Sequence, residues 1–560
     1  MNNGIENTFD AIVVGSGISG GWAAKELTES GLKTLVLERG RNVEHITDYP
    51  TAMNHPWEFK HRTHLDKTQM ADRPIQSSHC DDTNKHFFVK DTDHPYIQEK
   101  PFKWIRGYHV GGRSLTWGRQ CYRWSDLDFE ANKKDGHGVD WPIRYRDIEK
   151  WYSYVEKYVG ISGNKDELSQ LPDGEFLPPI PMNTIEKHLK ECTEQNFEDR
   201  SVINGRVANF TATREGGGKC FYRNMCSRGC PFAGYFSSNA YTLLDAQKTG
   251  NLTLRPDSIV KEVIYDDKKK KAVGVVVIDR QTKEELQFYS KIIFLNASTI
   301  GTTAILLNST SSAFPSGLGN SSGQLGHNLM DHVVNEGTYG LHDGFKDKYY
   351  EGRSPGTIYI PRFQNLNEKT KTRKFLRGYG IQGKGYREDW KQKLSNGIGV
   401  SLKKDLQVPG QWRISLTGRG ETLPYFDNKI SLDSEKKDQW GMPLVKIDFQ
   451  YGENELAMME HMTEESERIL RKSGFTKVKS FRKSPNPGSA VHEMGTARMG
   501  RNPKTSVLNK YNQMHDVKNI FITDGSCMTS SGSQNPSLTY MALTARACNY
   551  AVQQLKSGIL

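Results

Sequence analysis

Residues 9–20 read FDAIVVGSGISG, an apolar run that leads directly into the glycine motif Gly15-x-Gly17-x-x-Gly20. Each glycine of such a motif has a physical task. Gly15 permits a tight turn, Gly17 lets the backbone approach a pyrophosphate, and Gly20 lets a helix pack closely on a strand. The unpaired N–H groups at the start of the helix would face the phosphates. The segment therefore predicts a dinucleotide site.

The residues around the motif predict the elements that such a site requires. We expect a strand over 9–14, a helix over 22–30 that Gly31 ends, and a second strand over 34–37. Glu38 closes the second strand, where an acid can accept hydrogen bonds from ribose hydroxyls. Together these features predict an α/β fold with a Rossmann-like domain.

A second glycine segment, WIRGYHVGGRSLTWG over 104–118, bears on which dinucleotide is bound. Gly111 and Gly112 would let the backbone lie flat against an aromatic ring system, and Ser114 could hydrogen-bond to it. This pattern favours a flavin over a nicotinamide. Without further context, a tight structural loop stays open as an alternative.

Composition limits the classes of protein to which the chain can belong. Its 560 residues are enough for two or more domains, and 36% are hydrophobic, as in globular proteins. No run of 18 apolar residues occurs, so we expect no membrane span, and the N-terminus lacks the pattern of a secretory signal. The net charge of +11 comes without a nucleic-acid-binding motif, so nucleic acid is not an expected partner.

Several segments, taken in their order, resemble the glucose-methanol-choline (GMC) oxidoreductase family, and the resemblance runs nearly end to end. Besides the two glycine segments, they are Asp140-Trp141-Pro142-Ile143, residues 323–332 (GQLGHNLMDH), His492–Gly500, Asp524-Gly525 and Asn535-Pro536. No single segment is decisive, but their shared order makes chance agreement improbable. We expect residues 323–332 to form a loop near the flavin, with His327 and His332 in structural roles.

The resemblance implies two non-contiguous domains. A Rossmann-like FAD domain would comprise residues 1–45, 100–130, 205–335 and 490–560. A substrate domain on an antiparallel β-sheet would comprise 46–99, 131–204 and 336–489. Partial alternation of apolar and polar residues predicts its strands over 357–363, 397–402, 412–417, 429–432 and 444–449, with a hairpin connection over 433–441.

The resemblance also assigns the chemistry to His492 and Asn535, which are separated by 43 positions. His492 matches the base that accepts the alcohol proton, and a neutral imidazole can do this at neutral pH. Asn535 matches its partner, and an amide donates to the alcohol oxygen without competing for the proton. The α-hydrogen would leave as hydride to flavin N5. An amide at this place favours a secondary alcohol of a sugar.

The resemblance implies FAD as the cofactor, held without a covalent bond. Some relatives attach their flavin through a His just before the Trp of the second glycine segment, and here Thr116 precedes Trp117. His109 is a weaker alternative for attachment. The expected FAD-binding residues are Gly15, Ser16, Gly17, Gly20, Glu38, Arg39, Gly111, Gly112, Ser114, Thr116, Val260, Ala297, Asp524, Gly525, Asn535, Pro536 and Ser537.

Three of the eight cysteines form a cluster, Cys220-x5-Cys226-x3-Cys230, which Pro231 follows. Zinc would normally need a fourth ligand, and a disulfide would leave one thiol over, whereas thiolates on small loops suit an iron–sulfur cluster. The spacing resembles that of FAD-dependent sugar dehydrogenases of the GMC family, in which three cysteines hold a [3Fe–4S] cluster. Plain thiols, a disulfide and zinc stay open as alternatives.

This resemblance implies partners and a location as well. Such catalytic subunits fold with a small "hitch-hiker" subunit whose signal carries the complex to the periplasm, where a cytochrome c accepts electrons. Without such a partner, the chain would stay in the cytoplasm. The expected substrate is a sugar or glycoside, oxidised at C3.

Other activities stay open at this stage. Oxidation of fructose, gluconate, sorbose or glucose C1 would use the same base, and a sugar oxidase would pass electrons to dioxygen. A nicotinamide-dependent or purely regulatory nucleotide-binding protein would share the first glycine motif alone. Trp412, Arg413, Tyr379, Gln382 and Tyr386 are typical of carbohydrate-binding surfaces, but the sequence does not assign them substrate contacts.

Overall fold

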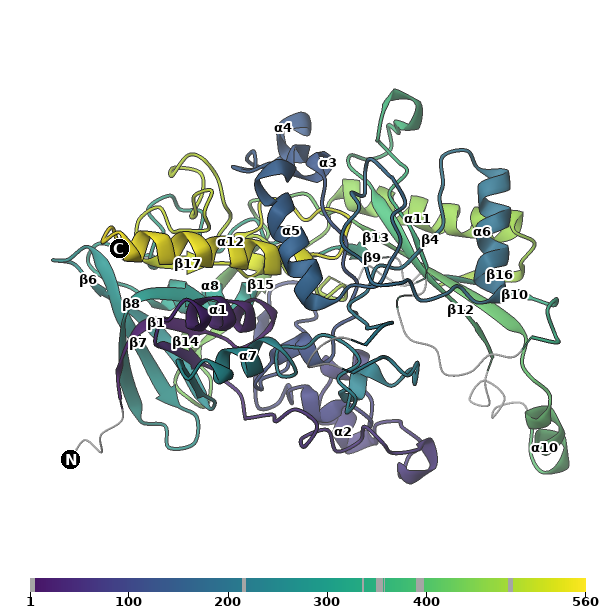
Figure 1. Ribbon diagram of the computed structural model, residues 1–560, viewed down its shortest axis with the longest axis horizontal. Helices are drawn as coiled ribbons and strands as arrows, with labels where there is room; N and C mark the ends of the chain where they lie inside the picture. Colours follow the sequence, from purple (N-terminus) through teal and green to yellow (C-terminus); the bar gives the residue numbers. More distant parts are fainter. Residues whose placement is uncertain are drawn as a thin grey trace.

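The computed structural model describes residues 6–213, 218–334, 337–348, 356, 358–388, 397–481 and 487–560 (Figure 1). The expected strand–turn–helix–strand unit is present as β1 (Thr8–Val14), α1 (Ile18–Glu29) and β2 (Thr34–Leu37). The helix begins at Ile18, four residues earlier than the sequence suggested, because Gly17 is already its N-cap. This early start brings the helix N-terminus directly to the glycine turn.

The first sheet has the strand order β5-β2-β1-β8-β7-β6, and β17 pairs with β8. Strand β1 is parallel to β2 and β8, whereas β6, β7 and β8 pair antiparallel. The remaining strands are β5 (Leu252–Arg255), β6 (Ser258–Asp266), β7 (Lys271–Asp279), β8 (Glu285–Leu295) and β17 (Ile520–Ile522). The sheet is therefore of Rossmann type and brings the two ends of the chain together.

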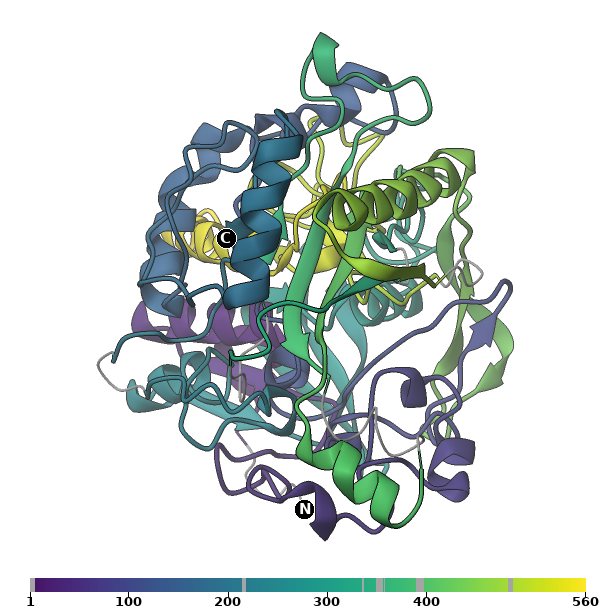
Figure 2. The same cartoon turned by 90° about the vertical axis from the view of Figure 1, so that its right-hand side faces the viewer.

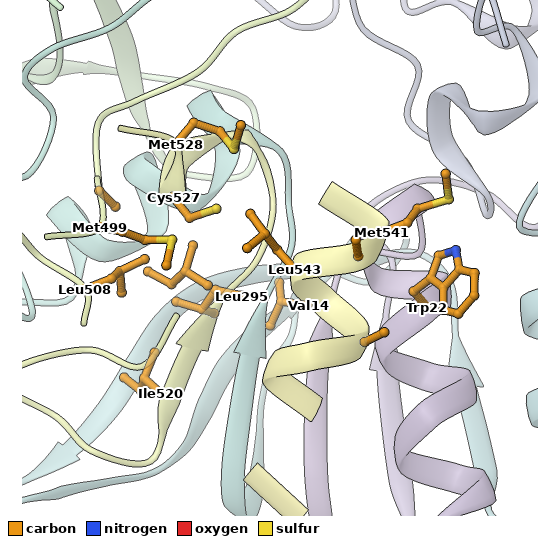
Figure 3. Close-up of a cluster of buried hydrophobic side chains, with 14 of the residues drawn as sticks. Val14, Trp22, Leu295, Met499, Leu508, Ile520, Cys527, Met528, Met541 and Leu543 are labelled. Atoms are coloured by element: carbon orange, nitrogen blue, oxygen red, sulfur yellow. The ribbon is translucent and has the colours of Figure 1, made fainter. Parts of the chain in front are cut away.

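Helices from both ends of the chain cover this sheet. α12 (Ser537–Lys556) lies beside α1 (Figure 1). Figure 3 shows Leu543 of α12 near Val14 at the end of β1, with Trp22 of α1 near Met541. All four side chains are almost completely buried. Burial of such side chains stabilises the fold by about 1.5–3 kcal/mol each, so this contact fixes residue 537 and its neighbours relative to the glycine turn.

The second sheet has the order β16-β10-β13-β12-β11-β4, with β9 beside β13. Its pairs β10–β13, β10–β16, β11–β12, β11–β4, β12–β13 and β13–β9 are all antiparallel. The strands are β4 (Ile203–Asn204), β9 (Val333–Val334), β10 (Thr338–His342), β11 (Ile358–Ile360), β12 (Tyr379–Arg387), β13 (Trp412–Gly420) and β16 (Thr476–Ser480). This confirms the expected antiparallel substrate sheet.

One face of the second sheet is apolar and covered by helices. α6 (Thr184–Asn196) and α11 (Glu453–Lys472) lie along it (Figure 2). Ile381, Ile414 and Leu416 point to this side, in a cluster with Met458 and Met462 of α11. Because side chains alternate along a strand, Gln382, Lys384, Arg413 and Arg419 belong to the opposite face. We call this opposite side the polar face.

Two expectations about the second sheet were wrong. Residues 397–402 do not form a strand, since Val400–Gln407 are helix α10, and Ile398 (92%) and Val400 (70%) are exposed. Strand β12 was missed because Gly380, Gly383 and Gly385 interrupt its apolar pattern. A Cβ at Gly385 would lie 2.4 Å from Ile185 of α6, so this glycine permits close packing. Thr357, expected to begin a strand, lies outside the described residues.

A third sheet joins the antiparallel pair β14 (Lys429–Lys437) and β15 (Pro443–Asp448) to β3 (Ile97–Gln98). The strands expected over 429–432 and 444–449 therefore belong to this separate sheet and not to the second one, because β14 and β15 pair with each other and β15 with β3. The connection between β14 and β15 is shorter than expected, because β14 continues to Lys437. The other helices are α2 (Lys67–Asp72), α3 (Asp126–Phe129), α4 (Ala131–Asp135), α5 (Tyr145–Val159), α7 (Thr242–Lys248) and α8 (Thr299–Asn308). None of the helices in the described ranges combines the length and apolar character that crossing a membrane requires.

Candidate active site

The glycine turn is built so that only one side stays open. Gly15 has φ +94°, and a Cβ there would lie 2.4 Å from the carbonyl oxygen of Asn296. A Cβ at Gly20 would lie 1.8 Å from the oxygen of Gly15, so helix and turn meet without side chains between them. A Cβ at Gly17 would meet nothing within 4 Å. This is the arrangement that lets a pyrophosphate approach the backbone at Gly17.

The second glycine segment lies against the first, as the flavin interpretation requires. A Cβ at Gly112 would come 3.4 Å from Cα of Gly17. The N–H of Gly111 donates to Oγ of Ser16 (2.9 Å), and this hydroxyl donates to Oε2 of Glu38 (2.6 Å). Burial raises the pKa of Glu38, which Ser16 and Gly40 oppose by hydrogen bonding. Residues from three segments therefore converge at one expected FAD site.

The other expected FAD-binding residues occupy the surroundings of this turn or the start of α12. Ser114 donates to the carbonyl of Gly111, and Arg39 donates to Asp438 at the third sheet. Asp524 accepts from Thr302 of α8. Ala297 follows β8 next to Gly15, and Val260 is buried in β6. Thr116 ends the second glycine turn, and Gly525 lies against the carbonyl of Glu493. Pro536 and Ser537 begin α12.

His492 and Asn535 are in contact, as expected. Nδ2 of Asn535 lies 3.3 Å from Nε2 of His492. Asn535 comes directly before Pro536, the N-cap of α12, and the N–H of His492 donates to Oδ1 of Asp331 (2.9 Å). Burial, with repulsion from Glu493, raises the pKa of Asp331 to about 7. The backbone of the histidine is therefore held by the segment 323–332.

His332 selects the tautomer of His492. Nε2 of His332 lies 3.0 Å from the carbonyl oxygens of Ser531 and Gly532, so it must carry a proton. Burial lowers the pKa of His332 to about 4, so this ring is neutral and its Nδ1 accepts. Nδ1 of His492 lies 2.9 Å away and must donate. Nε2 of His492 consequently has a free lone pair, directed at Asn535.

The opposite end of this chain of hydrogen bonds independently indicates that Nε2 of His492 is an acceptor. Arg419 can only donate, and its Nε lies 3.0 Å from Oε1 of Gln382. Nε2 of Gln382 then donates to Oδ1 of Asn535 (2.5 Å). This orientation turns Nδ2 of Asn535, a donor, towards Nε2 of His492. Arg419 and Gln382 lie on the polar face of the second sheet, on β13 and β12, so this sheet and the segment before α12 contribute to one site.

The electrostatic surroundings keep His492 neutral. Burial lowers its pKa well below the usual value, and His332, Arg419 and Arg113 add to the effect. A neutral imidazole with an unprotonated Nε2 is the form that can accept the proton of an alcohol. The site therefore pairs an unprotonated imidazole nitrogen with an amide donor, both held in one orientation.

The three clustered cysteines lie on a loop that touches the second glycine segment. The hydroxyl of Tyr235 is 2.7 Å from the carbonyl oxygen of Leu115 and 3.1 Å from that of Cys226. The N–H of Gly234 donates to Sγ of Cys230 (3.3 Å). Burial raises the pKa of Cys220 and of Cys230, and charge on the neighbouring thiols adds to it.

All eight cysteines are free, so the alternative of a disulfide has no support in the structure. Within the described ranges, no group of three or more His, Cys, Asp or Glu side chains is arranged to hold a metal ion. The structure therefore gives no support to the expected metal role of Cys220, Cys226 and Cys230, including zinc.

Comparison with known families agrees with the geometry. Two models described as GMC oxidoreductase match the chain, one over residues 9–334 and one over 424–544. The chain belongs to the GMC oxidoreductase family. This confirms the resemblance and excludes the alternative of a purely regulatory nucleotide-binding protein. The glycine turn with its open side at Gly17 fits FAD, which would lie along Gly17 and Gly111–Gly112.

Curated relatives of the GMC protein match over nearly their whole length. It is 26% identical to 2-methyl-1,2-propanediol dehydrogenase of Mycolicibacterium austroafricanum, covering 97% of this chain and 94% of the relative. It is 23% identical to the fructose dehydrogenase large subunit of Gluconobacter japonicus, covering 98% of each. A solved structure of a variant of Aspergillus oryzae formate oxidase, a protein in which FAD is modified, shares the fold (TM-score 0.63, 14% identity, 99% of each chain).

The sequence did not reveal three side chains of this site. His332 was interpreted as structural, although its ring contacts that of His492. Gln382 was recognised only as typical of carbohydrate-binding surfaces, and Arg419 was not singled out. One signal could have pointed to Arg419, since Arg413, Ser415, Thr417 and Arg419 alternate with apolar residues and so mark a polar side of β13.

Proposed function

We propose that this GMC oxidoreductase is an FAD-dependent dehydrogenase that oxidises a secondary hydroxyl of a sugar or glycoside, with C3 as the preferred carbon. The observation that carries the proposal is the contact between Nε2 of His492 and Nδ2 of Asn535. A base and an amide donor side by side can bind one alcohol oxygen and remove its proton. When bound, FAD supplies the hydride acceptor.

The two side chains divide the work on the hydroxyl. Nε2 of His492 accepts its proton, because the tautomer leaves a lone pair there. Nδ2 of Asn535 donates to the alcohol oxygen and supports the negative charge that develops on it. The amide does not titrate, so it does not compete for the proton. The polar face of the second sheet adds Gln382 and other hydrogen-bonding groups that suit a sugar.

Anaerobic mixing with a panel of sugars and glycosides tests this proposal. The expected result is bleaching of the flavin absorbance by at least one sugar, and NMR of the product should place the new ketone at C3. His492→Ala should slow the bleaching by a factor of about 100 to 10,000, the usual worth of a general base, without loss of bound FAD. Rapid bleaching in His492→Ala would contradict the role of the base.

We further propose that the electrons leave through a [3Fe–4S] cluster held by Cys220, Cys226 and Cys230. The proposal rests on the spacing of the three cysteines, which resembles that of FAD-dependent sugar dehydrogenases of the GMC family; their thiols are free of disulfides. The hydroxyl of Tyr235 connects this loop with Leu115 beside the expected flavin. Such a cluster would supply one-electron transfer to an external acceptor.

Chemical analysis and turnover decide between a dehydrogenase and an oxidase. About three irons and four sulfides per chain are expected, lost in Cys226→Ser but not in Cys192→Ser, whose thiol lies on α6. Turnover should proceed with a one-electron dye and not with dioxygen. Absence of iron, together with stoichiometric hydrogen peroxide, would instead support a GMC-type sugar oxidase.

We also propose a small hitch-hiker subunit, export of the complex to the periplasm, and a cytochrome c as acceptor. One relative is itself named as a large subunit, which fits a chain that works with others. Co-expression with neighbouring genes and purification through a tag on this chain test the proposal. Isolation of the chain alone from the cytoplasm, fully active, would oppose it.

A further inference from the structure

The polar face of the second sheet carries positive charge close to the reacting pair. Gln382 of β12 contacts Asn535, and Lys384 follows two residues later on the same side. Residues two apart on a strand are spaced by about 7 Å, roughly one sugar ring. In the register of the sheet, Lys384 lies opposite Ser415, while Tyr386 lies opposite Arg413. Lys384 is therefore about one ring away from Gln382, which contacts Asn535 of the reacting pair, and Arg413 lies beyond Lys384.

These cations have little negative charge around them. Among the residues that the structure describes, no carboxylate forms an ion pair with Lys384 or Arg419, and Arg413 approaches Glu388 only at 3.9 Å. Within the described ranges, Nη1 of Arg419 and Nε of Arg413 are buried without a hydrogen-bond partner. Asp331 is the described acid that acts on Arg419 electrostatically, but its oxygens accept N–H groups of Ala490 and His492.

Lys384 itself is held in an unfavourable environment for a cation. Its side chain is exposed, yet the surrounding protein and the charge of Arg413 lower its pKa. The guanidinium of Arg413 lies 3.7 Å from the ring centroid of Tyr339, which fixes its position on the same face. A cation that is crowded by another cation and lacks a carboxylate gains strongly from an anionic ligand.

We propose that the substrate of this enzyme is a sugar that carries an anionic group, and that Lys384 and Arg413 bind this group while His492 acts on a hydroxyl about one ring away. The inference rests on the proposed function and narrows its substrate class. A carboxylate of a sugar acid and the phosphate of a sugar phosphate share the required charge. Both can accept from the ammonium and the guanidinium.

The test uses the FAD-loaded full chain and three probes of one sugar, namely D-glucose, D-glucuronate and D-glucose 6-phosphate. Rates of anaerobic flavin bleaching are measured at constant ionic strength. We expect at least one anionic probe to exceed glucose more than tenfold in kcat/KM, and the better of the two identifies the group. Lys384→Met should lower kcat/KM for that probe at least tenfold, mostly through KM, and should lower kcat/KM for glucose by a much smaller factor.

Lys437→Met serves as the matched control, because Lys437 is an exposed lysine on β14 in the third sheet. It should leave both rates unchanged. Glucose bleaching the flavin as fast as both anionic probes, or an equal effect of Lys384→Met on all three, would overturn the inference while leaving the proposed function intact.

A second readout separates the two ideas if no probe bleaches the flavin. The proposed function would fail only if the whole panel of sugars and glycosides also left the flavin unbleached, and binding alone would then decide the inference. An anionic probe should still raise the melting temperature of the wild type and not that of Lys384→Met, whereas glucose should raise neither. No stabilisation by either anion would overturn the inference.

Discussion

Replacing Gln382 by Leu breaks the hydrogen-bonded chain that orients the amide of Asn535. The substitution leaves Nε of Arg419 and Oδ1 of Asn535 without the partners they have now, at 3.0 and 2.5 Å. A buried polar group that loses its partner costs about 1–3 kcal/mol. If one such cost falls on the transition state, kcat/KM drops about 5- to 150-fold, since 1.36 kcal/mol is a factor of ten.

Gln382→Glu tests whether the donor–acceptor direction of the hydrogen bonds matters, or only the presence of a side chain of this size. A carboxylate still accepts from Arg419, but it cannot donate to Oδ1 of Asn535. The amide would turn its Nδ2 towards residue 382 and its oxygen towards His492, which favours a proton on Nε2 and removes the base. Although Glu has nearly the same shape as Gln, we expect it to be at least as damaging as Leu.

The assay is anaerobic stopped-flow bleaching of the flavin, with the limiting rate separated from the sugar affinity. The limiting rate should fall, because the amide acts on the reacting oxygen. Gln364→Leu is the control, since Gln364 is a buried glutamine near the second sheet whose Oε1 accepts from the backbone N–H of Tyr379 and not from Arg419. Wild-type rates in Gln382→Glu would refute the reasoning about the tautomer of His492.

Three further predictions follow from the same geometry. In a pH profile, kcat/KM should fall on acidification with an apparent pKa below that of a free histidine, because burial lowers the pKa of His492. Arg419→Met removes a nearby cation and should move this acidic limb of the profile to higher pH. The free energy of unfolding, measured by urea titration, should fall between pH 7 and pH 5 by about 2 kcal/mol for each of His109 and His332. Their pKa is about 4 in the folded protein and 6.5 in the unfolded chain, so the unfolded state takes up protons first. In His109→Gln the fall should be smaller by the share of one histidine. Gly17→Val should fill the open side of the glycine turn, so the purified chain should lack FAD by its absorbance spectrum while keeping its circular dichroism, and full flavin content would contradict the assignment.

The sequence predicted the parts of the fold that depend on local patterns. The glycine turn, β1 and β2 follow from spacing within 30 residues, and the contact of His492 with Asn535 followed from a family resemblance. Strand β12 could not be predicted from a local pattern, because its glycines permit the packing of α6, which lies almost 200 positions earlier in the chain. Local alternation contains no information on such a neighbour.

The orientation of the site could not be predicted for a similar reason. The tautomer of His492 depends on His332 and on two carbonyl oxygens at residues 531 and 532, which meet only in the folded protein. The direction of the Asn535 amide depends on Arg419, 116 positions away. The sequence contained a polar side of β13, but it did not indicate which residue this side would face.

The chain of hydrogen bonds from Arg419 to His332 has a consequence for recombination among relatives. Arg419 and Gln382 lie in the second sheet and His332 directly precedes its strand β9, whereas His492 and Asn535 come from the C-terminal part of the chain. Each end of the hydrogen-bonded chain specifies the same proton position on His492. A chimaera that receives its substrate sheet from a relative would fold as long as the interface packs, yet it would lose turnover if the donor places an acceptor where Gln382 now donates. Whether two proteins of this family can be recombined should therefore be judged by the donor or acceptor character of the side chains that meet at the site, and not by their size.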